Sequence, residues 1–346
     1  MKMSQIYGLL GGFFLAYLVV HVASPPKLSS RDPKPSNPEA QPAQNSGTAA
    51  VATGLSVVVP TTQSDAYALE IALEKLQRAG ARHVSLVVAF AQSDASSADI
   101  TTLTPIPVVQ RGLARARALG LAVMVRPVIA PRDGAWRNRI APAKPVEWFT
   151  QYQTALIPLW DVAQQEGAAS VAVAVGLPQM DEADWSLVIQ TAKQHFKGRL
   201  LYGASGVAGV KRFRHWRELS GVGVENVFRL SAEATIDPAA IAAGWRNVAD
   251  ELEQTLTEQG LEPDVTVTSV GFAALQGALV DPEHPPLDAS PAPLLPQQAI
   301  AGFYEQWGAR PWLKQVYWHT WWTPSGRSPY LLDGQPAFNV FQTHWQ

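Results

Sequence analysis

Short apolar runs alternate with amphipathic segments along most of the chain. Eight runs, rich in Val, Leu and aromatic residues, are predicted as strands: 55–59, 83–90, 121–129, 170–176, 200–205, 221–228, 264–272 and 315–322. Five of the segments between them carry apolar residues at three- and four-residue spacing, which predicts helices at 65–80, 108–120, 146–167, 183–196 and 239–260. The pattern is therefore one of repeated strand and helix units.

This alternation predicts an α/β fold with a parallel sheet. Strands that are apolar throughout are typical of sheets covered on both faces, and eight of them fit a (β/α)8 barrel. A doubly wound open sheet is the alternative. It is less favoured because neither GxGxxG nor GxxxxGK[ST] follows any of the predicted strands.

The N-terminal region has a different pattern. Residues 6–22 form an apolar, uncharged run of about 17 residues, the short end of what spans a bilayer. A cut after Ala23 would place His21 third from the end, and a cut after Ser24 would be followed by Pro25, so neither is a good signal-peptidase site. We predict an uncleaved single-pass anchor over residues 1–23 in the inner (cytoplasmic) membrane. A cleaved signal peptide and a buried core helix are the alternatives.

Residues 24–53 are rich in Pro, Ser, Ala, Asn and Gln and contain no aromatic residue, which predicts a disordered linker. The barrel domain is then expected over residues 54–346, in the periplasm or outside the cell.

Composition excludes several classes of function. The 27 basic and 29 acidic residues give a net charge of -2, so no electrostatic footprint for nucleic acid exists. The absence of Cys excludes thiol catalysis, Cys-ligated zinc and disulfides. His319 has no second His at HxH or HxxxH spacing, so no metal site and no cofactor is predicted.

In such a barrel, ligands meet the loops after the carboxyl ends of the strands. Residues at these positions are the ligand-binding candidates: Arg126, Trp136, Gln179, Glu225, His319, Trp321 and Trp322. Six of the 12 Trp fall in the last 40 residues. Alternation along the last strand places Trp318 and Trp322 on one side and Trp321 on the other. A Trp at the mouth offers a face that stacks on a sugar ring, although core packing accounts for about half of these residues.

Hydrolysis of a glycosidic bond normally requires two carboxyl groups that face each other. The candidates near strand ends are Glu225, Asp133 and Asp181. Each also has a structural interpretation: contacts with Arg or with backbone amides for Glu225, a turn with Gly134 for Asp133 and a helix cap for Asp181. No GxSxG motif accompanies Ser269, so a hydrolytic triad is not indicated.

From about Thr101 to Trp345 the chain resembles glycoside hydrolase family 113, a group of (β/α)8 endo-β-mannanases of a retaining clan. The segments that carry the resemblance are LAVMVRPVIAPRDGAWRNRIAP, WFTQYQTALIPLWDVAQQEGAASVAVAVG, RLLYGAS, HWRELSGVGVENVF, VTSVGF, PWLKQVYWHTWW and GQPAFNVFQTHW. Their order and spacing, rather than any one of them, make the resemblance.

The resemblance implies where catalytic groups would lie. The acid/base Glu of the family would fall on Pro178, beside Gln179, and its nucleophile Glu on Ser269. A site-lining Asp of the family corresponds to Glu225, and a His after the basic-Pro step is replaced by Val128. Both catalytic carboxylates are therefore expected to be absent.

Three hypotheses follow. The first is a membrane-tethered pseudoenzyme that binds carbohydrate or scaffolds envelope polysaccharide processing, with envelope proteins as further partners. The second is an active β-glycan hydrolase that uses displaced carboxylates from Glu225, Asp133 or Asp181. The third is a structural interaction domain without a sugar site.

Overall fold

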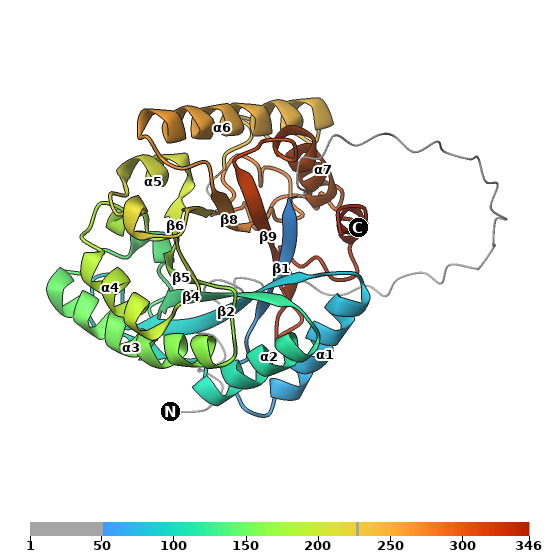
Figure 1. Ribbon diagram of the computed structural model, residues 1–346. Helices are drawn as coiled ribbons and strands as arrows, with labels where there is room; N and C mark the ends of the chain where they lie inside the picture. Colours follow the sequence, from blue (N-terminus) through green and yellow to red (C-terminus); the bar gives the residue numbers. More distant parts are fainter. Residues whose placement is uncertain (1–50, 226–227, 346) are drawn as a thin grey trace.

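The computed structural model describes residues 51–225 and 228–345, which form a ring of strands surrounded by helices (Figure 1). The barrel strands in these residues are β1 (Ala52–Val58), β2 (His83–Gln92), β4 (Ala122–Pro131), β5 (Ser170–Val175), β6 (Arg199–Ser205), β7 (Val222–Glu225), β8 (Val265–Val270) and β9 (Leu313–Trp322). Neighbouring barrel strands are parallel, and β1 pairs with both β2 and β9. The sheet is thus closed, which confirms the (β/α)8 barrel, and the open-sheet alternative is wrong.

Helices cover the outside of this barrel. They are α1 (Ala66–Arg78), α2 (Ile106–Ala118), α3 (Pro145–Gln165), α4 (Ser186–His195), α5 (Gly206–Arg212), α6 (Pro238–Glu258), α7 (Leu295–Trp307) and the short C-terminal α8 (Phe338–Gln342). The five predicted helices are all present. The pattern did not single out α5, α7, α8 or β3 (Thr101–Thr102), a two-residue strand that pairs antiparallel with the end of β2.

The interior of the barrel determines which side chains reach its mouth. Met124, Leu201 and Tyr317 form a small apolar cluster, separate from the large core that lies between the sheet and the helices. Arg126 follows Met124 by two residues on β4, and His319 follows Tyr317 by two residues on β9. Because alternate residues of a strand share a face, Arg126 and His319 point into the same interior, one step nearer to the carboxyl ends of the strands.

The start of the domain lies close to the predicted boundary. β1 begins at Ala52, two residues before the predicted start at 54, and the Thr53 hydroxyl lies 2.7 Å from the Tyr304 hydroxyl. Ala and Thr are only weakly apolar, so composition alone did not separate them from the linker. The predicted anchor and all but the last residues of the predicted linker lie outside the described residues. Among the residues described, no helix has both the length and the hydrophobicity to span a bilayer.

Candidate functional site

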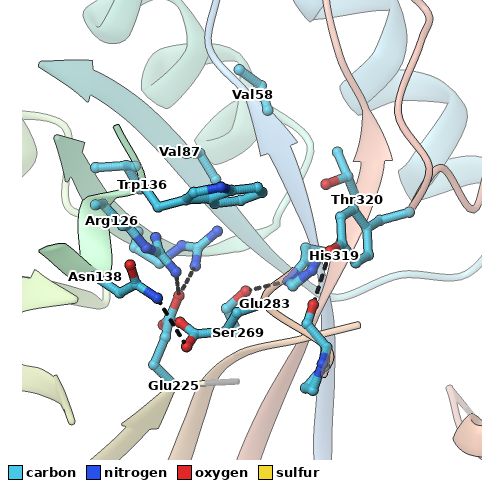
Figure 2. Close-up of a pocket in the computed structure, with 14 residues that line it drawn as sticks. Val58, Val87, Arg126, Trp136, Asn138, Glu225, Ser269, Glu283, His319 and Thr320 are labelled. Atoms are coloured by element: carbon cyan, nitrogen blue, oxygen red, sulfur yellow. Dashed lines mark hydrogen bonds and ion pairs between the residues drawn. The ribbon is translucent and has the colours of Figure 1, made fainter. Parts of the chain in front are cut away.

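A pocket opens at the carboxyl ends of the barrel strands, where (β/α)8 barrels bind their ligands (Figure 2). Residues at the end of strands line its floor and wall: Val58, Val87, Arg126, Val128, Glu225, Ser269, His319 and Thr320. Residues from loops line its rim: Trp136, Arg137, Asn138, Pro282, Glu283 and Tyr330. Of the predicted ligand-binding residues, the fold therefore brings Arg126, Trp136, Glu225 and His319 together.

Glu225 lies at the centre of this pocket and is only 1% exposed. Its Oε1 accepts hydrogen bonds from Nη1 of Arg126 at 2.7 Å and from Nη2 of Arg137 at 3.0 Å. Its Oε2 accepts one from the Thr268 hydroxyl at 2.8 Å. Burial lowers the pKa of Arg126, and the negative charge of Glu225 opposes this shift. A guanidinium group stays protonated in proteins, so a buried cation, Arg126, and a partly buried one, Arg137, share one carboxylate.

Two glycines make room for this arrangement. Gly176 follows β5 with a φ of +60°, and a Cβ there would lie 2.7 Å from Cζ of Arg137. A Cβ at Gly271 would lie 2.4 Å from the backbone oxygen of His319. Real Cβ atoms do not approach heavy atoms so closely, so Gly271, which faces backbone, requires the absence of a side chain. At Gly176 a side chain would displace the Arg137 guanidinium and would also strain the positive φ.

Ser269 and His319 form a second polar contact on the pocket floor. The Ser269 hydroxyl lies 2.6 Å from Nδ1 of His319. Burial, together with the positive charges of Arg126 and Arg137, lowers the pKa of His319 well below its ordinary value. The imidazole is therefore neutral, and its tautomer determines whether Nδ1 accepts a hydrogen bond from the Ser269 hydroxyl or donates one to it.

The rim is formed where two loops meet. The Trp136 ring packs edge-on against the His284 ring, with centroids 4.8 Å apart, and Nδ2 of Asn138 lies 3.4 Å from Oε2 of Glu283. In Figure 2 the Trp136 side chain lies above Arg126 and Glu225. Burial raises the pKa of Glu283, while Arg137, Asn138 and His284 oppose this shift. Glu283 was not predicted, because it lies far beyond the end of β8, in a loop whose path the sequence pattern does not define.

Comparison with known proteins identifies the family to which this barrel belongs. The family model described as Glycoside Hydrolase Family 113 matches residues 61–328. The chain belongs to this family. Two solved structures of GH113 enzymes have similar folds. One is a complex of a GH113 beta-1,4-mannanase, at 16% identity and a TM-score of 0.73, covering 86% of this chain and 99% of that one. No curated protein matches the sequence.

The other is the GH113 beta-mannanase AaManA from Alicyclobacillus acidocaldarius in complex with ManMIm, at 17% identity and a TM-score of 0.70. This comparison covers 84% of this chain and 96% of that one. At these identities the likeness is one of fold. It agrees with the closed barrel seen in the present chain.

The two positions where the GH113 resemblance places catalytic carboxylates lie in different surroundings. Ser269 lines the pocket and is the register partner of Glu225 between β7 and β8. Pro178 and Gln179 belong to the short helix η4 (Pro178–Met180) and line a separate hollow with Glu182 and Arg212. Gln179 is therefore absent from the lining of the main pocket.

Neither of the two aspartates predicted as displaced carboxylates lines the pocket. Asp181 is fully buried, accepts hydrogen bonds from the Tyr202 hydroxyl and from Arg212, both at 2.9 Å, and has a pKa raised by burial. Asp133 is exposed, and its Oδ1 accepts a hydrogen bond from the Ala135 backbone N–H at 2.9 Å. Asp133 is thus held within its own turn. Asp181 is held by side chains of β6 and α5, and the helix cap predicted for it is wrong because the residue that precedes α4 is Trp185.

The two tryptophans at the end of β9, Trp321 and Trp322, also lie outside the pocket lining. Trp321 is 2% exposed and packs against Phe338 of α8, and Trp318 packs against Phe303 of α7. Sugar stacking by Trp321 and Trp322 stays a prediction, while Trp136 is the tryptophan that lines the pocket. Within residues 51–225 and 228–345, no group of three His, Asp or Glu side chains is arranged to hold a metal ion.

Proposed function

We propose that this GH113 chain is a membrane-tethered glycoside hydrolase-like protein that binds a carbohydrate in the pocket without hydrolysing it. The observation that carries this proposal is the state of the central carboxylate. Glu225 is buried, and two guanidinium groups and a hydroxyl already occupy its oxygens. The resemblance to the family assigns the nucleophile position to Ser269, whose hydroxyl forms a hydrogen bond with His319.

The chemistry of retaining glycosidases explains why this arrangement favours binding over turnover. Such enzymes need one carboxylate to attack the sugar and one carboxylic acid to protonate the leaving group, about 5 Å apart. A serine hydroxyl in place of the nucleophilic carboxylate cannot form the glycosyl ester that is the covalent intermediate of these enzymes. Pro178 has no proton to donate to the leaving group. Neither position provides the group that the reaction requires.

The pocket nevertheless has the features of a sugar-binding site. Trp136 offers an aromatic surface, and Arg126, Arg137 and Asn138 offer hydrogen-bond donors around it. Burial of one sugar face at roughly 25 cal/mol per Å², less the cost of ordering, implies micromolar to millimolar dissociation constants. We further propose that envelope proteins are additional partners of the domain. They would contact it at the membrane, where residues 1–23 would anchor it.

A second candidate function is hydrolysis with displaced carboxylates. It is favoured by Glu283, which lines the same pocket as Glu225 and has a pKa raised by burial, as a general acid requires. In this case the ion pairs of Glu225 with the two arginines would have to break before Glu225 could act as the second catalytic carboxylate.

One experiment separates the two functions. The purified full-length protein in detergent is incubated with β-1,4-mannan and other β-1,4-glycans, and new reducing ends are measured beside calorimetric binding of the same oligosaccharides. We expect binding without new reducing ends. Turnover that is lost in both Glu225→Gln and Glu283→Gln, but kept in Glu182→Gln, would establish the hydrolase instead.

A further inference from the structure

The pocket holds more positive charge than its central carboxylate compensates. Arg126 and Arg137 both donate to the same oxygen of Glu225. A guanidinium group has five N–H donors, and the one described hydrogen bond of Arg126 goes to Glu225. Nε of Arg126 is buried and has no partner among the described residues. Arg126 therefore keeps hydrogen-bonding capacity that the described residues do not use.

Among the described residues of the lining, Glu283 is the one remaining titratable group that can balance this charge. His319 is neutral because its pKa is lowered well below the ordinary value. Burial and the charge of Asp281 disfavour the ionised form of Glu283, against the opposing effects of Arg137, Asn138 and His284. Tyr330, which also lines the pocket, has a raised pKa and stays neutral. Each time Glu283 binds a proton, two cations face one anion.

We propose that the pocket binds the carboxylate of an acidic sugar, so that its ligand is an oligosaccharide of uronic acid units rather than a neutral glycan. This inference rests on the proposed carbohydrate-binding function and specifies its substrate class. A carboxylate matches the planar fork of a guanidinium with two parallel hydrogen bonds, which a hydroxyl group does not. Trp136 would lie against the apolar face of the same sugar ring.

A matched pair of ligands tests the inference. β-1,4-linked mannuronic acid oligosaccharides and β-1,4-linked manno-oligosaccharides of equal length share linkage and ring stereochemistry and differ in the carboxylate. We expect calorimetry on the full-length protein to give roughly tenfold or greater preference for the acidic ligand, decreasing as salt rises. Equal or tighter binding of the neutral ligand would overturn the inference and leave the proposed function standing. Binding of neither ligand would overturn both.

Variants locate the preference in the pocket. Arg137→Gln should remove most of the preference for the acidic ligand, whereas Arg139→Gln removes the same charge from an exposed position on the same helical turn, η3 (Arg137–Arg139), and should leave it unchanged. Glu283→Gln removes a competing negative charge and should strengthen acidic binding severalfold at neutral pH. Equal losses in the two arginine variants, or weaker acidic binding in Glu283→Gln, would contradict the inference. Unfolding midpoints of all variants report whether each one is folded.

Discussion

Glu225 is the residue on which the pocket depends electrostatically. Replacing it by Gln keeps the shape of the side chain but leaves the buried guanidinium of Arg126, and the partly buried one of Arg137, without this counter-charge. Breaking a buried ion pair on one side typically costs about 3–5 kcal/mol. We expect urea unfolding of Glu225→Gln to show a loss of this order, and Glu233→Gln, at an exposed position, to lose less than about 0.5 kcal/mol. Similar stability in both variants would show that the ion pairs contribute little.

His319 predicts a pH dependence of stability. Because the folded protein lowers its pKa well below the ordinary value of 6.5, the unfolded chain binds a proton that the folded chain does not. The contribution of His319 to stability is therefore present above pH 6.5 and decreases as the pH falls below it, by up to about 1.4 kcal/mol per pH unit. The variant His319→Asn lacks this pH-dependent contribution to stability.

The measurement is the free energy of unfolding of both proteins between pH 8 and pH 5. The difference between wild type and His319→Asn should shrink as the pH falls, while other titrating groups, such as Asp181 and Glu283, contribute to both proteins alike. A difference that is constant with pH would show that folding does not shift the pKa of His319.

At the residue scale, the sequence predicted the strand-borne part of the pocket but, of its rim, only Trp136. Arg126, Glu225 and His319 were found because each lies near the end of an apolar run, and parallel strands end at one edge of the barrel. Arg137 and Glu283 come from loops, and their approach to Glu225 and Asn138 depends on backbone paths that hydrophobic periodicity does not encode. Ion pairing of Glu225 with arginine was one structural interpretation, and the fold confirms it.

At the scale of elements, the end of β5 determines where the loop after β4 can lie. Gly176→Ala would place a methyl group against the Arg137 guanidinium and would also strain a left-handed φ. Gly167→Ala is the matched control, because Gly167 has a φ of +72° and no atom lies within 4 Å of the place that a Cβ would occupy there. Gly176→Ala should lose roughly 1–3 kcal/mol more stability than the control. Equal losses would show that Arg137 moves aside at no cost.

The strand β9 shows where periodicity fails as a guide. Strict alternation predicted that Trp318 and Trp321 face opposite sides, yet both pack against helices, and the consecutive residues His319 and Thr320 both line the pocket. The register between β1 and β9 shifts between Trp318 and Trp322. An irregularity near the end of a strand moves the following side chains to the other face of the sheet, and the hydrophobic pattern of the sequence does not indicate where it occurs. The predicted positions of the other strands were correct to within a few residues because those strands are buried apolar runs.

At the scale of the whole molecule, the predicted anchor lies outside the described residues and is tested in the cell. We expect full-length protein to fractionate with membranes and to keep Met1 or the residue after it as its mature N-terminus, because residues 6–22 are apolar and lack a good cleavage site. Deletion of residues 1–23 should release the protein into the soluble fraction. A mature chain that starts near Ser24 would contradict the anchor.

The central claim is that a family 113 barrel binds carbohydrate where it no longer cleaves it. The most direct measurement is a crystal structure of the protein soaked with an uncleaved β-1,4-linked mannuronic acid oligosaccharide. We expect an intact oligosaccharide with one sugar ring against Trp136 and a carboxylate within hydrogen-bonding distance of Arg126 or Arg137. A shortened product, a covalent bond from the sugar to Glu225, or a sugar bound only outside this pocket would contradict the claim.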